Sequence, residues 1–113
     1  MAKSLLPSAL LFLVLSLLAV INLTEAQIGV CYGMLGDNLP SRQEVVNMYE
    51  QYGIRRMRLY GPDGAAFQAL DGSQIELILD VPYQNLPDLA QNLSSATAWV
   101  HDNIINHPGV NFK

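Results

Sequence analysis

The chain of 113 residues has a single cysteine, and only 14% of its residues are charged. One cysteine excludes an internal disulfide framework, and no cluster of cysteine and histidine has the spacing of a zinc site. With 6 Lys and Arg against 10 Asp and Glu, the net charge of −4 leaves no basic surface for nucleic acid. A glycine-rich phosphate loop and a nucleophile elbow are also missing. We therefore expect no metal ion, no cofactor and no nucleic-acid partner.

The N-terminus is strongly apolar. Lys3 precedes a largely apolar run of about 13 residues, Ala9 to Ile21, and small residues stand just before a possible cut after Ala26. This pattern is typical of a secretory signal peptide. A membrane anchor is the alternative, but a span needs roughly 20 residues. We expect residues 1–26 to be removed and residues 27–113 to be secreted as a monomer without a membrane span.

Secretion affects the interpretation of two residues. Cys31 lies between Val30 and Tyr32 in an apolar segment, which favours a buried, inert thiol over a reactive one. Asn92 begins the triplet Asn-Leu-Ser, which is an acceptor for N-glycosylation in a secreted protein. Asn92 is therefore a candidate for glycosylation.

Strand-like and helix-like patterns alternate after the N-terminal run. The expected strands are 28–32, 54–60, 75–81 and a fourth that begins at Val110. The third is a nearly continuous apolar run, typical of a strand that is buried on both faces of a parallel sheet.

Helices are expected between these strands. Ser41 and Glu44 form a capping box at the start of the first. Its apolar stripe is Val45, Val46, Tyr49 and Tyr52, and Gly53 is its expected end. A short helix follows at about 65–70. A single longer helix is expected from Pro87 to His107, with a stripe of Leu89, Leu93, Ala96, Val100 and Ile104.

Alternation of strands and helices predicts a parallel α/β fold. The strand starts are about 21 to 35 residues apart. Eight such units would give the roughly 250 residues of a (β/α)8 barrel, although an open doubly wound sheet has the same pattern. Three strands and the start of a fourth leave unpaired edges, so we interpret the chain as the N-terminal part of a longer fold.

In both architectures the functional site lies at the carboxyl ends of the strands. Alternation places Arg58 and Tyr60 on the face opposite Met57. A guanidinium cannot lose its proton and is costly to bury unpaired, so Arg58 requires a carboxylate. That partner is either a group on a strand outside this sequence or, on the neighbouring strand, Asp80 or Glu76.

Other side chains near these strand ends allow two interpretations each. Tyr60 suits stacking on a sugar ring, although such a tyrosine can also serve packing alone. Asp80 is a candidate general acid or base, but glycoside hydrolysis requires two carboxyl groups. Asp37 and Asp63 are expected to serve turns.

Seven motifs resemble one known family. They are Gln27–Gly33, Gly36–Arg42, Tyr52–Ile54, Met57–Tyr60, Leu77–Pro82, Ala98–Val100 and Val110–Lys113. In this order they are similar to the start of the plant β-1,3-glucanases of glycoside hydrolase family 17. The resemblance implies a (β/α)8 barrel that hydrolyses internal β-1,3 linkages of glucan with retention of configuration. It also implies a role in plant defence, with callose or fungal wall glucan as substrate, in the cell wall or the vacuole.

The resemblance also implies roles for individual residues. Arg58 and Tyr60 match family residues that line the substrate cleft, and Tyr32 matches one at its floor. Both catalytic glutamates of the family are expected beyond Lys113, so we expect the 113-residue chain alone to be inactive. Two loop positions, Asp37 and Tyr83, differ from the asparagines that are common in the family.

Two other functions remain open from the sequence. One is an enzyme of the same family that cleaves mixed β-1,3/1,4-glucan. The other is a secreted protein that binds glucan or a partner without catalysis, if the chain ends at Lys113.

Overall fold

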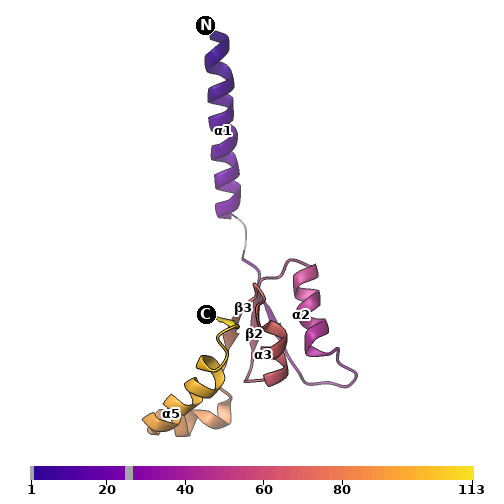
Figure 1. Ribbon diagram of the computed structural model, residues 1–113, viewed down its shortest axis with the longest axis vertical. Coiled ribbons are helices and arrows are strands. Elements are labelled where there is room, and N and C mark those ends of the chain that lie inside the picture. Colours follow the sequence, from indigo (N-terminus) through magenta and orange to yellow (C-terminus); the bar gives the residue numbers. More distant parts are fainter. Residues whose placement is uncertain (1, 25–26) are drawn as a thin grey trace.

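The computed structural model describes residues 2–24 and 27–113. The apolar N-terminal residues form helix α1 (Ala2–Thr24), which stands apart from the rest of the chain (Figure 1). Within the described part of the chain, we find no helix that is long and apolar enough to cross a membrane. The expected cut after Ala26 lies outside the described residues, and the signal peptide stays a prediction.

The described residues form one four-stranded parallel sheet in the order β1-β2-β3-β4. The strands are β1 (Val30–Tyr32), β2 (Arg56–Leu59), β3 (Glu76–Leu79) and β4 (Asn111–Phe112). The predicted parallel α/β fold is therefore confirmed. Consecutive strands are neighbours and the strand order never reverses, unlike in a doubly wound sheet. This order is consistent with part of a (β/α)8 barrel.

Helix α2 (Arg42–Gln51) begins with the predicted capping box. The Glu44 N–H donates to Ser41 Oγ at 3.2 Å, and the Ser41 N–H donates to Glu44 Oε2 at 2.7 Å. The predicted stripe is buried except for Tyr52, which is 72% exposed. That part of the prediction was wrong because α2 ends at Gln51 and the chain turns at Gly53, whose φ of 69° favours glycine.

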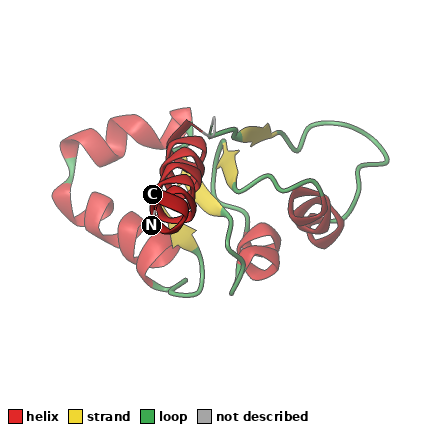
Figure 2. Cartoon of the chain, turned by 90° about the horizontal axis from the view of Figure 1, so that it is seen from above, coloured by secondary structure: helices red, strands yellow, loops and turns green. Residues whose placement is uncertain are grey.

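Helices α2 and α3 (Gly64–Leu70) pack against each other and against one face of the sheet (Figure 2). Burial of apolar side chains on this face is the main stabilising contribution available to the chain. The buried core consists of Val45, Val46, Tyr49, Met57, Leu59, Ala66, Phe67, Leu70, Ile75, Leu77 and Val110.

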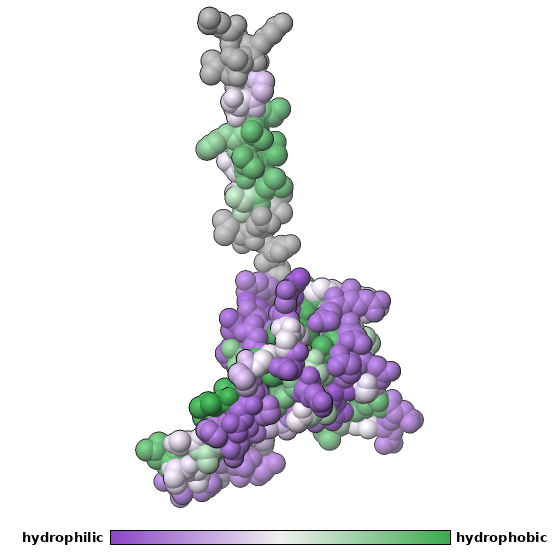
Figure 3. Space-filling model, viewed as in Figure 1, coloured by the Kyte–Doolittle hydropathy of each residue, from purple (hydrophilic) through white to green (hydrophobic). Residues whose placement is uncertain are grey.

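The expected single helix after β3 is two helices. A short 3-10 turn η1 (Tyr83–Asn85) leads into α4 (Leu86–Gln91), and α5 (Leu93–Val100) continues into the π-helical segment η2 (His101–Ile105). The chain breaks at Asn92, whose extended backbone and side chain cap α5. In the described chain α4 and α5 contain no buried residue, and hydrophobic groups are visible on this region at the lower left of Figure 3.

The opposite face of the sheet is not covered by helices of the described chain. Residues Cys31, Arg58 and Ile78 are aligned across β1, β2 and β3 on this face. Ile78 of β3 is 52% exposed on this face. The prediction that the third strand is buried on both faces was therefore wrong for Ile78. The thiol of Cys31 is also exposed, which corrects the prediction of a buried cysteine.

Candidate functional site

The uncovered face brings three polar side chains together at the carboxyl end of the sheet. Arg58 lies on β2, Tyr60 follows this strand directly, and Asp80 follows β3. Arg58 Nη2 donates to Asp80 Oδ2 at 2.6 Å, and Arg58 Nε lies 3.1 Å from Asp80 Oδ1. The carboxylate that the sequence required for Arg58 is therefore Asp80, on the neighbouring strand.

This ion pair determines the charge of both groups. The hydrogen bond from Arg58 lowers the pKa of Asp80, and the same bond raises the pKa of Arg58. Asp80 is therefore ionised at neutral pH, whereas a general acid must hold a proton there. Asp80 accordingly serves as the partner of Arg58, and the geometry does not favour the general-acid role.

Tyr60 lies against the guanidinium of Arg58. The carbon atom at the centre of this guanidinium is 5.1 Å from the centroid of the Tyr60 ring, within the range of a cation–π contact. The thiol of Cys31 is the largest influence on the Tyr60 hydroxyl and raises its pKa. The ring is 54% exposed, so a neutral aromatic surface remains available to a ligand.

Tyr32 does not join this cluster. It is aligned with Leu59 on the helix-covered face and packs against the buried core. Its hydroxyl is buried and has no hydrogen-bond partner among the described residues. The structure thus brings Arg58 and Tyr60 together and places Tyr32 on the other face, and a contact between Tyr32 and glucan stays a prediction.

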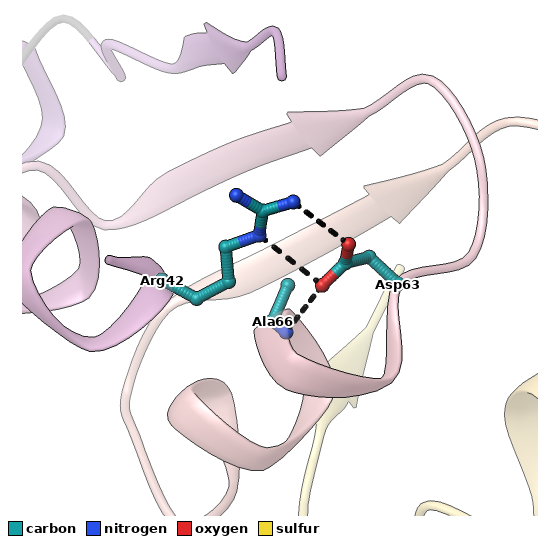
Figure 4. A network of polar contacts seen from close by, with 3 residues as sticks. All are labelled: Arg42, Asp63 and Ala66. Carbon is teal, nitrogen blue, oxygen red and sulfur yellow. Dashed lines mark hydrogen bonds and ion pairs between the residues drawn. The ribbon is translucent and has the colours of Figure 1, made fainter. Parts of the chain in front are cut away.

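A second polar network joins the loops that follow β1 and β2 (Figure 4). Arg42 at the start of α2 donates to Asp63 through Nη2 at 3.1 Å, and Asp63 accepts from the Ala66 N–H at 2.7 Å. Asp63 is the N-cap of α3, so it has a structural role, but it caps a helix and does not serve a turn as predicted. The network fixes the segment that begins at Tyr60 relative to the start of α2.

Further charges lie towards the amino end of the uncovered face. Arg56 Nε is 3.0 Å from Glu76 Oε2, and Lys113 Nζ is 3.6 Å from Glu76 Oε1. These residues and Ile78 line a shallow depression. Glu76 is therefore paired at this end and does not contribute a carboxylate to the Arg58 cluster.

Two members of the site were not identified from the sequence. Cys31 is aligned with Arg58 across β1 and β2, which brings it towards Tyr60. Strand alternation is a signal that could have placed Cys31 on this face, but the register that aligns it with Arg58 depends on both strands. The contact of Arg42 with Asp63 joins the first residue of α2 to the N-cap of α3 and has no local sequence signal. Across the described residues, no group of three or more His, Cys, Asp or Glu side chains is arranged to hold a metal ion.

Comparison with known proteins gives a uniform result. A family model described as glycosyl hydrolases family 17 matches residues 28–113. A glucan endo-1,3-β-glucosidase of Nicotiana tabacum is 54% identical over 98% of this chain and 32% of the relative. A basic isoform from Phaseolus vulgaris is 57% identical over 77% of this chain and 25% of the relative. The chain thus spans about a third or less of the length of these curated relatives.

Solved structures agree with this result. One of two plant β-glucan endohydrolases with distinct substrate specificities has a TM-score of 0.75 and 44% identity, over 76% of this chain and 28% of the other. The β-1,3-glucanase and allergen CJP38 of Cryptomeria japonica pollen has a TM-score of 0.75 and 42% identity, over 78% of this chain and 28% of the other. Because the family model covers most of the sequence, the chain belongs to glycosyl hydrolase family 17.

Proposed function

We propose that this chain is part of a secreted glucan endo-1,3-β-glucosidase that cleaves internal linkages of β-1,3-glucan with retention of configuration. Family membership and the names of the relatives support this activity. The observation that carries the proposal is the cluster of Arg58, Tyr60 and Asp80 at the carboxyl end of the sheet, where barrel enzymes bind their substrates. Callose and the glucan of fungal walls are the proposed substrates, in keeping with a role in plant defence.

The proposed role of this cluster is to bind a glucosyl unit. The exposed ring of Tyr60 offers an apolar surface for the carbon–hydrogen face of the sugar, and its hydroxyl offers a polar tip. Arg58 is held by Asp80 and retains guanidinium donors that suit sugar hydroxyl groups. In this proposal Asp80 positions Arg58 and does not react.

The 113 residues alone are proposed to lack hydrolytic activity. A retaining glycosidase requires an acid and a nucleophile, both carboxyl groups, about 5 Å apart. In the described part of the chain, Glu44 is in a capping box and Glu76 is paired with Arg56. Asp80, the carboxylate of the cluster, is ionised and bound to Arg58. These three carboxyl groups are engaged with other groups of the chain, and none of them is proposed as the acid or the nucleophile.

Glucan binding by the expressed chain tests this proposal. Calorimetric titration with a β-1,3-linked gluco-oligosaccharide should show binding, and Tyr60→Ala should weaken it roughly tenfold because a stacked aromatic surface is lost. Tyr52→Ala is the matched control, since Tyr52 is 72% exposed at the end of α2 and lies outside the cluster. Equal affinities of the two variants would contradict the assignment of Tyr60.

Two further measurements separate the other functions. Release of reducing sugar from laminarin by the 113 residues would show that a catalytic pair is present after all. Tighter binding of barley mixed-linkage glucan than of laminarin would favour an enzyme that cleaves β-1,3/1,4-glucan. We expect no hydrolysis and a preference for laminarin.

A further inference from the structure

Asn92 has a surface position between α4 and α5 that the glucanase function does not use. The residue is exposed, and the following Leu93 is 82% exposed. Its backbone, with φ of −129° and ψ of 106°, is extended, so the triplet Asn92-Leu93-Ser94 forms a corner at the surface and not part of a continuous helix.

The two ends of the Asn92 amide have different surroundings. Three donors converge on Oδ1: the Ser94 N–H at 3.1 Å, the Ser94 hydroxyl at 2.7 Å and the Ser95 N–H at 3.4 Å. Because donors point at this atom, it is the oxygen, and the nitrogen Nδ2 is directed elsewhere. Within the described chain Nδ2 donates to no protein group.

We infer that Asn92 is N-glycosylated when the protein passes through the secretory pathway. The inference goes beyond glucan hydrolysis and rests on the proposed secretion. The donor is a lipid-linked oligosaccharide diphosphate. Nδ2 attacks C1 of its first sugar, so an N–C bond forms while the bond from C1 to the diphosphate oxygen breaks. Nδ2 loses one proton to the transferase, and the lipid diphosphate leaves.

The fold is compatible with this modification because the cap of α5 uses the oxygen alone. A glycosylated asparagine keeps its Oδ1, so the bonds from Ser94 and Ser95 remain. The glycan would extend from the surface beside Leu93, a large apolar side chain that is otherwise exposed. None of the three residues of the triplet belongs to the Arg58 cluster, which consists of Arg58, Tyr60 and Asp80.

Translation of the 113-residue chain in the presence of endoplasmic-reticulum microsomes tests the inference. We expect a product that is protected from added protease and migrates more slowly by one core oligosaccharide, and peptide-N-glycosidase should reverse this shift and convert Asn92 to Asp. Ser94→Ala should abolish the shift completely because the acceptor hydroxyl is lost. Ser95→Ala is the matched control and should retain it, since Ser95 is outside the triplet.

Three results would overturn the inference. A chain that is protected from protease but carries no glycan would show that Asn92 is not an acceptor. A chain that remains accessible to protease would contradict the proposed secretion as well. A shift that persists in Ser94→Ala places the glycan at Asn22, the other triplet of the sequence. Exposure of Asn92 is tested on the folded product, from which the glycosidase should release the glycan without denaturant.

Discussion

The cap of α3 provides a test of how local hydrogen bonds hold the site loops. Asp63 makes two separable contributions: it accepts from the Ala66 N–H at 2.7 Å, and it pairs with Arg42. Asparagine caps a helix about as well as aspartate, whereas alanine does not. Asp63→Asn therefore removes the charge pair and keeps the cap, while Asp63→Ala removes both.

The difference between the two variants isolates the cap. Loss of an N-cap costs about 1 kcal/mol of the free energy of unfolding. In a domain of this size, 1 kcal/mol corresponds to a shift of about 4–8 °C in the melting temperature. We expect Asp63→Ala to melt below Asp63→Asn by about this amount. Because α3 carries the core residues Phe67 and Leu70, unfolding of α3 should unfold the rest of the core as well. Far-UV circular dichroism with heating is the assay.

The pH dependence separates the charge pair from the cap. Burial acts to raise the pKa of Asp63, but hydrogen bonds from Arg42 and the Ala66 N–H outweigh it, and the pKa lies below its usual range. The stabilisation from a lowered carboxyl pKa is complete above the unfolded pKa of about 3.9 and is lost as the pH falls through the folded pKa. The difference in melting temperature between wild type and Asp63→Asn should therefore disappear at acidic pH. The difference in melting temperature between Asp63→Asn and Asp63→Ala should persist there. Equal melting temperatures of the two variants at neutral pH would refute the reasoning.

Three further predictions concern the two faces of the sheet. Leu77→Ala should reduce the free energy of unfolding by about 2–5 kcal/mol because Leu77 is fully buried. Ile78→Ala on the uncovered face should change it by less than about 0.5 kcal/mol. Urea titration measures both values, and similar losses would contradict the assignment of the faces. Arg58→Gln should raise the pKa of Asp80 towards its usual value in a carboxyl NMR titration, and an unchanged pKa would show that Arg58 does not control it. Cys31 should react with a disulfide reagent in the folded chain, and a reaction that requires prior unfolding would show that the thiol is buried after all.

Much of the fold was predictable because its signals are local. The capping box of Ser41 and Glu44 involves residues three positions apart, and the turn at Gly53 depends on one residue. Both were predicted and confirmed. The face that carries Arg58 and Tyr60 also followed from the alternation of one strand.

The remaining features depend on contacts between distant residues. The sequence left the partner of Arg58 open between a carboxylate outside this sequence, Asp80 and Glu76. The register decided between the last two, because Arg56 and not Arg58 stands opposite Glu76. No single strand contains that information. The same limit explains Tyr32, whose alignment with Leu59 directs it to the core side of the sheet.

The break at Asn92 has a different cause. The apolar stripe of the expected helix is satisfied equally by one helix or by two, so periodicity does not distinguish them. The asparagine side chain competes with the backbone for the N–H groups of Ser94 and Ser95, and this local bond ends one helix and begins the next.

The sequential order of the strands has a consequence for how such a protein can change. Since β1 to β4 are neighbours in the order in which they are synthesised, the loops that follow them meet the rim of the sheet in the same order. A polymer lying along this rim would encounter the segments after β1, β2 and β3 one after another. An insertion in one of these loops would leave the segments after the other strands in the same order and register. The rim can therefore change one connection at a time without any change in the pairing of the strands.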